Sequence, residues 1–144
     1  MTGKWQQFLQ NHYRKLFEEK IEAHRDCVVS IPIGSKYQHL YRGFGKTRLI
    51  LELSNKYKLP IIAVTNHQAE ELKDKARRLG FGNVRVLMLN RNMRGVLRPG
   101  QIVLVDGGME MLSCDSFAIN NNVGVVGFIW SLGGKRPYIH KIML

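Results

Sequence analysis

Residues 59–80, LPIIAVTNHQAEELKDKARRLG, place a short apolar strand directly before a capped helix. The run at 59–65 suits a buried strand, and Pro60 fits at its start because proline cannot donate to a strand ladder. Thr65 is a favoured N-cap, and Gly80 ends the helix. The helix turns an apolar stripe inward, formed by Ala69, Leu72, Ala76 and Leu79. We also expect two i,i+4 ion pairs along it, Glu71–Lys75 and Asp74–Arg78. The stretch therefore predicts a strand–helix unit of an α/β fold.

The same alternation continues on both sides of this unit. Upstream, apolar periodicity predicts helices at 4–24 and 46–58 and a buried strand at 27–33, where Pro32 indicates the strand's end or an edge. Downstream, strand-like runs occur at 84–89, 101–105, 123–130 and 138–143. Short strands that alternate with helices are joined by crossovers. The sequence thus predicts one α/β domain over residues 1–144, a three-layer sandwich with a mostly parallel sheet and an N-terminal amphipathic helix.

Positive charge dominates the composition. The chain has 22 Lys and Arg against 11 Asp and Glu, a net charge of +11. This potential attracts polyanions, so nucleic acid is the expected partner class, although a basic surface that only aids solubility has the same composition. The two cysteines and five histidines show no metal-ligand spacing. No signal-like or membrane-length apolar run is present, so we expect a cytoplasmic protein without a membrane partner.

The stretch LYRGFGKT at residues 40–47 lies between the strand at 27–33 and the helix at 46–58. Loops that bind nucleotide phosphates have the pattern GxxxxGK[ST], in which glycines let the backbone approach the phosphates and the hydroxyl binds Mg²⁺. The second half of this pattern is present as Gly43, Gly45, Lys46 and Thr47. Leu40 replaces the first glycine, and the connection is about four residues longer than the usual eight-residue loop. A phosphate loop therefore competes with a structural turn or a nucleic-acid loop as the interpretation.

An acidic residue follows the predicted strand at 101–105. This residue, Asp106, precedes two glycines in the run QIVLVDGG. Parallel strands end at one edge of a sheet, and ligands of open α/β sheets bind at that edge. A carboxylate there can hold hydrated Mg²⁺ while Thr47 contacts the metal directly. The alternative is an ordinary Asp-Gly turn.

These two segments resemble the Walker A and Walker B motifs of P-loop NTPases of the RecA-like or helicase-like branch, and more narrowly those of small phage-type ATPases. The resemblance covers roughly residues 27–131 and implies that the chain binds ATP and Mg²⁺. The nucleotide would be bound by Gly43, Phe44, Gly45, Lys46, Thr47 and Arg48. The metal would be held by Thr47 and Asp106, and the catalytic residues would be Lys46, Asp106 and Glu110.

Several further roles follow from the resemblance. Relatives have a water-orienting Glu immediately after the Walker B Asp, where this chain has Gly107. Glu110 is the nearest carboxylate; it either takes that role or lies on a helix face without one. Ser131 occupies the strand-end position of a phosphate sensor in relatives. An arginine finger offered to a neighbouring subunit, or contacts with a nucleic-acid backbone, would come from Arg42, Arg91, Arg94 and Arg98, with Tyr41 as a stacking platform; a solvated loop is the alternative for residues 91–98.

The predicted function is a slow Mg²⁺-dependent ATPase that acts on or with nucleic acid, DNA being favoured, in replication, recombination or packaging. A phage origin would place it in the host cytoplasm, and a homo-oligomer would complete the site. The alternative is a basic nucleic-acid-binding module on a degenerate P-loop scaffold, without hydrolysis. A nucleoside kinase is disfavoured because 144 residues leave little room for a lid and an acceptor site.

Overall fold

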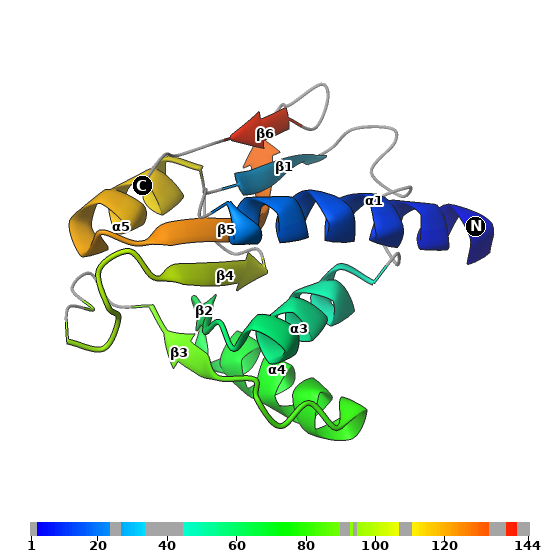
Figure 1. Cartoon of the computed structure of the whole chain (residues 1–144), viewed down its shortest axis with the longest axis horizontal. Helices are drawn as coiled ribbons and strands as arrows, with labels where there is room; N and C mark the ends of the chain where they lie inside the picture. The colour runs from blue at the N-terminus through cyan, green and yellow to red at the C-terminus, as the bar shows by residue number, and fades with distance from the viewer. Residues whose placement is uncertain are drawn as a thin grey trace.

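The computed structural model describes residues 3–23, 27–33, 45–89, 93, 95–106, 111–132 and 138–140. Its helices are α1 (Gly3–Glu22), α3 (Lys46–Tyr57), α4 (Asn66–Leu79) and α5 (Met111–Asn121). Its strands are β1 (Cys27–Ile33), β2 (Ile61–Ala63), β3 (Val86–Met88), β4 (Ile102–Asp106), β5 (Gly124–Leu132) and β6 (Tyr138–His140). Figure 1 shows these elements arranged as a twisted sheet flanked by helices.

The strands form one six-stranded sheet in the order β3-β2-β4-β5-β1-β6. The first five strands in this order are parallel to one another, and β6 pairs antiparallel with β1. The prediction of a mostly parallel sheet is therefore confirmed. Pro32 lies near the end of β1, beyond the three residues Val28–Ser30 with which β6 pairs. This position agrees with the expected edge or strand end, because proline has no N–H for a second neighbour.

The lengths of the strands differ at the carboxyl edge of the sheet. Asp106, the last residue of β4, pairs with Phe128 of β5, and Phe128 pairs with Val29 of β1. Both β1 and β5 then continue for four more residues, to Ile33 and Leu132. At about 3.3 Å per residue, they extend about 13 Å beyond the end of β4.

Helices α1, α3 and α4 cover one face of the sheet. Their core includes the apolar residues of α4 predicted to face inward, and the aromatic face of α1 also packs here. Tyr13 and Phe17 meet the ring of Phe128 edge to face, with centroids 5.3 and 5.0 Å apart. Ion pairs join α1 to α3, among them Arg14–Glu52 at 2.8 Å. The N-terminal helix is thus packed on the domain.

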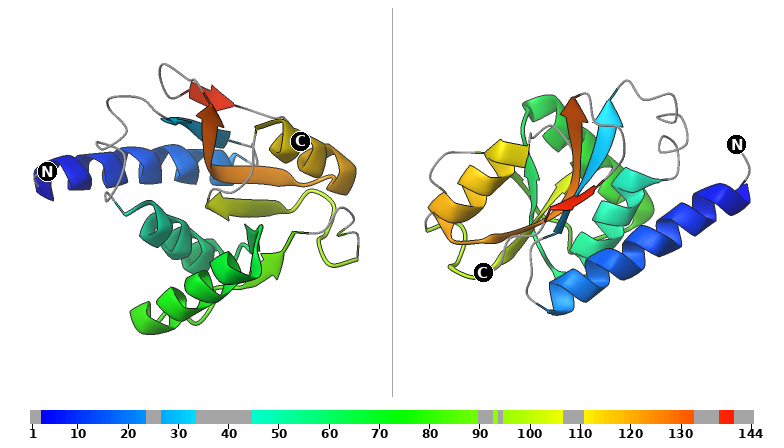
Figure 2. Two further views of the ribbon diagram at one scale, coloured as in Figure 1. Left: turned by 180° about the vertical axis from the view of Figure 1, so that it is seen from behind. Right: turned by 90° about the horizontal axis from the view of Figure 1, so that it is seen from above.

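Helix α5 covers the opposite face, as the right-hand view in Figure 2 shows. Phe117 and Ala118 pack against Val103 and Val105 of β4, whereas the alternate β4 residue Leu104 belongs to the core on the other face. Strand β4 is therefore buried on both sides, and the fold is an α/β arrangement compatible with three layers. No helix was predicted over 111–121, although one alternative for Glu110 placed that residue on a helix face, so the extent of α5 is a finding of the structure.

The boundaries of α4 agree with its sequence signals. Thr65 Oγ1 accepts a hydrogen bond from the Gln68 N–H at 3.1 Å, and Gly80 adopts the left-handed conformation with φ 75°. The expected ion pair between Asp74 and Arg78 forms, at 3.8 Å. The expected Glu71–Lys75 pair does not appear; Glu71 instead lies 2.9 Å from His67 Nε2. The helix ends were predictable, whereas the choice between two partners on the same helix was not.

Candidate functional site at the carboxyl edge of the sheet

The first turn of α3 meets the end of β4 at the carboxyl edge of the sheet. Thr47 Oγ1 donates a hydrogen bond to Asp106 Oδ2 at 2.7 Å, although the two residues are 59 positions apart in the chain. Thr47 is placed by the helix that begins at Lys46, and Asp106 by the strand that ends there. The structure therefore brings together the two residues that the sequence assigned to Mg²⁺.

Gly45 is the N-cap of α3 and has a left-handed backbone, with φ 88° and ψ 39°. This conformation favours glycine because a side chain would clash with the backbone. The position is also crowded, since a Cβ atom here would lie 2.2 Å from Gln10 Nε2 of α1. The Gly45 carbonyl accepts from the Leu49 N–H at 2.9 Å and so begins the helical hydrogen-bond pattern. The first N–H groups of an α-helix are in general left to partners other than the carbonyls of that helix.

Burial changes the acidity of the Asp106 carboxyl. Its withdrawal from water raises the pKa from 3.8 to about 6, because the charged form loses hydration. The Thr47 hydrogen bond and the positive charges of Lys46 and Lys75 oppose this shift by stabilising the anion. Because burial disfavours the charged form of this carboxyl, a cation bound beside it would stabilise the carboxylate.

Gln68 fixes the backbone of the site, although it was not among the predicted site residues. Its Nε2 donates to the Asp106 carbonyl at 3.2 Å, and its Oε1 accepts from the Val64 N–H at 2.8 Å. The amide thereby ties the end of β4 to the connection between β2 and α4. A signal was available, because Thr65 and Gln68 have the S/T-x-x-E/Q spacing of a capping box.

A pocket of about 620 Å³ opens beside the Thr47–Asp106 pair. It lies between these residues and one side of α4. The α4 residues that line it are Gln68, Glu71, Leu72, Asp74, Lys75 and Arg78. The pocket is therefore strongly polar, with charges of both signs around the Asp106 carboxylate.

Arg48, which was predicted to contact a nucleotide, has an ion-pair partner on its own helix. Its Nε lies 3.2 Å from Glu52 Oε1, one turn farther along α3. The Glu52 carboxylate also forms an ion pair with Arg14 of α1. In this structure Arg48 therefore joins the polar contacts between the helices.

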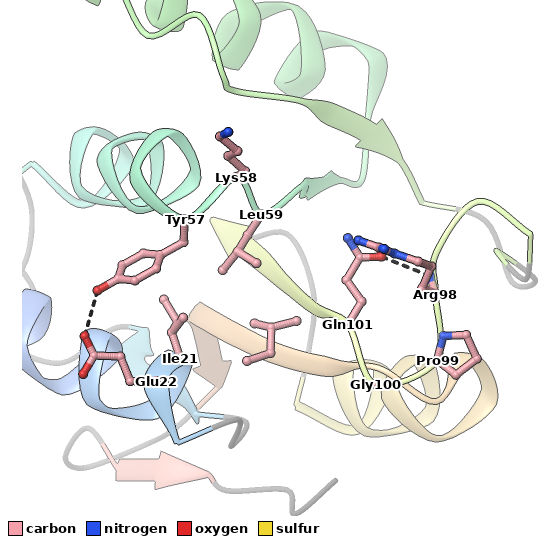
Figure 3. Close-up of a pocket in the computed structure, with 10 residues that line it drawn as sticks. Ile21, Glu22, Tyr57, Lys58, Leu59, Arg98, Pro99, Gly100 and Gln101 are labelled. Carbon is pink, nitrogen blue, oxygen red and sulfur yellow. Dashed lines mark hydrogen bonds between the residues drawn. The ribbon is translucent and has the colours of Figure 1, made fainter.

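Arg98 lies at the other edge of the sheet. It precedes β4, whereas Asp106 is the last of the five residues of that strand. Figure 3 shows Arg98 and Gln101 on one side of a second pocket, of about 660 Å³, with Tyr57 and Glu22 on the other. Arg98 therefore cannot act as an arginine finger on the site of its own chain, and the intersubunit role expected of it would use this opposite edge.

Most of the remaining predicted site residues lie outside the described residues, whereas Ser131 lies within them. Residues that lie outside the described part are Tyr41, Arg42, Gly43, Phe44, Arg91, Arg94 and Glu110. Ser131 belongs to β5, three residues beyond Phe128, which pairs with Asp106. The strand register thus places Ser131 about 10 Å past the end of β4, so the pair and the proposed sensor stand at different levels of the sheet.

No protein-family model matches the chain, and neither a curated protein nor a solved structure was found to be similar to it. Within the described ranges, no helix is both long and apolar enough to cross a membrane. No group of three or more His, Cys, Asp or Glu side chains arranged to hold a metal ion occurs in those ranges either. The assignment of a function therefore depends on the residues and their geometry.

Proposed function

We propose that this chain binds Mg²⁺-ATP at the carboxyl edge of the sheet and hydrolyses it slowly. The observation that carries the proposal is the 2.7 Å contact between Thr47 and Asp106 beside the N-terminus of α3. A hydroxyl at the start of a helix and a carboxylate at the end of a strand are the two groups that hold Mg²⁺ in P-loop NTPases. Lys46 precedes Thr47 in the sequence, and its charge acts on Asp106.

The pair suits Mg²⁺ better than a metal that needs a full protein cage. Mg²⁺ keeps several waters and is bound through one or two protein groups together with substrate phosphates. Thr47 and Asp106 supply two adjacent oxygen atoms and leave the other positions to phosphate and water. Metal binding would also replace the hydration that the half-buried Asp106 has lost.

The phosphates would lie on the first turn of α3. Backbone N–H groups at a helix N-terminus attract anions, and the left-handed Gly45 lets the chain approach without a side chain. The Lys46 ammonium would add a charge-assisted contact to the β- and γ-phosphates. With Gly107 after Asp106, water would be poorly oriented, and this supports slow turnover rather than loss of binding.

Nucleic acid is the partner that we propose for this ATPase, with DNA favoured. Support comes from the net charge of +11, which concentrates polyanions near the surface. Assembly into a homo-oligomer would let one subunit complete the site of another.

The first experiment compares wild type with Lys46→Ala, and with Lys15→Ala as a control of equal charge on the exposed face of α1. Titration calorimetry should show Mg²⁺-ATP binding by wild type and by Lys15→Ala. Loss of Lys46 should weaken it by about 10- to 100-fold, since a hydrogen bond to a charged group contributes about 1.5–3 kcal/mol. DNA affinity at matched salt should stay within about twofold of the control.

A different result would favour the non-hydrolysing nucleic-acid module. In that case wild type shows no affinity for Mg²⁺-ATP, and Lys46→Ala instead lowers the slope of log affinity for DNA against log salt concentration by about one. The same titrations thus decide between the two interpretations of the loop.

The second experiment tests the metal contact of Thr47. Thr47→Val removes the hydroxyl at nearly constant volume, whereas Thr47→Ser keeps it. We expect Mg²⁺ to strengthen ATP binding by wild type and Thr47→Ser, and Thr47→Val to lose about tenfold or more of this Mg²⁺-dependent gain. Equal Mg²⁺ dependence in all three proteins would rule out Thr47 as a ligand.

A further inference from the structure

One side of α4 faces the Thr47–Asp106 pair. Gln68, Lys75 and Arg78 recur at steps of seven and three residues, so they lie along the same side of the helix. All three line the pocket that also contains Thr47 and Asp106. Because α4 follows β2, which is paired with β4, the helix approaches the site from the side opposite to β5 and β1.

Lys75 differs from the other charged residues on this side. Glu71 lies 2.9 Å from His67, and Asp74 lies within 4 Å of both Arg77 and Arg78. Among the described residues, Lys75 takes part in no such ion pair. Its side chain is half-buried, whereas the neighbouring Lys73 is largely exposed beside Glu70.

The strand order decides which part of a bound nucleotide would meet this lysine. The connection that carries the phosphate-loop pattern begins after β1, which is separated from β4 by β5. Lys75 lies on the other side of β4. A chain of phosphates that starts on the β1 side and shares Mg²⁺ with Thr47 and Asp106 would therefore reach Lys75 with its terminal group.

We propose that Lys75 contacts the terminal phosphate of the bound nucleoside triphosphate, so that α4 distinguishes ATP from ADP. This inference rests on the proposed function and adds the residue that detects the third phosphate. The electrostatic coupling of Lys75 to Asp106 agrees with it, since the lysine charge already reaches the carboxylate that would hold the metal. Lys46, at the start of α3, would also contact the β-phosphate, which both nucleotides possess, so its loss should weaken ADP as well as ATP.

The test measures affinities for Mg²⁺-ATP and Mg²⁺-ADP by calorimetry in wild type, Lys75→Met, Lys75→Arg and Lys73→Met. Methionine keeps much of the apolar stem, and thermal unfolding checks that each variant folds. We expect Lys75→Met to weaken ATP about tenfold and ADP less than twofold. Lys75→Arg should retain part of the preference, and Lys73→Met should match wild type.

The outcomes separate this inference from the function on which it rests. If wild type binds neither nucleotide, the proposed function fails and the role of Lys75 fails with it. If wild type binds ATP but Lys75→Met weakens both nucleotides equally, or neither, the site stands and the role of Lys75 is wrong. If Lys75→Met does not fold, Lys75→Arg provides the test. Its preference for ATP over ADP should then be smaller than that of wild type, and an unchanged preference would contradict the role of Lys75.

Discussion

Replacement of Asp106 by asparagine is expected to stabilise the nucleotide-free protein at neutral pH while it removes the Mg²⁺-dependent gain in ATP affinity. In the folded protein, burial raises the pKa of this carboxyl from 3.8 to about 6. The unfolded chain therefore releases the proton at lower pH than the folded chain does. Consequently the contribution of Asp106 to the free energy of unfolding falls as pH rises from about 4 to about 6, and its loss is complete above that range.

The difference between the pKa values of Asp106 in the folded and the unfolded chain corresponds to at most about 3 kcal/mol of free energy of unfolding. Solvent around the half-buried side chain reduces this contribution. We expect Asp106→Asn to be about 1–2 kcal/mol more stable than wild type at pH 8 and nearly equal to it at pH 4. Asparagine can still accept the hydrogen bond from Thr47. Urea unfolding in EDTA at pH 4, 6 and 8 measures the difference.

Asp74→Asn is the control, since that carboxylate is 59% exposed and lies outside the core. As a surface substitution it should stay within about 0.5 kcal/mol of wild type at pH 8. A difference for Asp106→Asn that is constant with pH, or a loss of stability at pH 8, would contradict the prediction. A gain in stability combined with loss of Mg²⁺ dependence would identify Asp106 as a residue retained for function at the expense of stability.

Gly127→Ala is expected to have the largest effect on folding. Gly127 of β5 pairs with Val105 of β4, and a Cβ atom on it would lie 1.9 Å from the Val105 carbonyl oxygen. Both strands are in the middle of the sheet, so neither backbone can move without disturbing its other neighbour. We expect a loss of more than about 3 kcal/mol, a large part of the 5–15 kcal/mol that is typical of a domain.

Gly82→Ala is the matched control for this substitution. Nothing lies within 4 Å of a Cβ atom added at Gly82, so its unfolding midpoint should change little. Chemical denaturation of both variants beside wild type provides the comparison. Similar midpoints for Gly127→Ala and wild type would show that β4 and β5 do not approach as closely as described.

Local signals predicted most of the secondary structure. The ends of α4 followed from a capping threonine and a terminal glycine, whose effects are confined to neighbouring residues. Helix α5 lacked such signals, because MLSCDSFAINN mixes polar and apolar residues without a clear stripe. The parallel pairing of β4 and β5 nevertheless requires a crossover between them. The topology thus implied an element that the residue pattern did not reveal.

The candidate site was predictable where a motif fixes position relative to a strand or helix end. The approach of Thr47 to Asp106 followed from their places at the start of a helix and the end of a parallel strand. The involvement of Gln68 and Lys75 depends on how α4 lies against β4, which no local pattern encodes. No local pattern predicted that Arg48 would pair with Glu52, which also contacts another helix.

The overhang of β1 past the end of β4 has a consequence for the length of the connection that follows it. The chain climbs four residues above the level of Asp106 before β1 ends, yet it must return to that level for Thr47 to reach the carboxylate. Such a descent needs about four extended residues. The stretch of sequence between the end of β1 and Thr47 therefore has to be about four residues longer than in a sheet whose parallel strands end at one level.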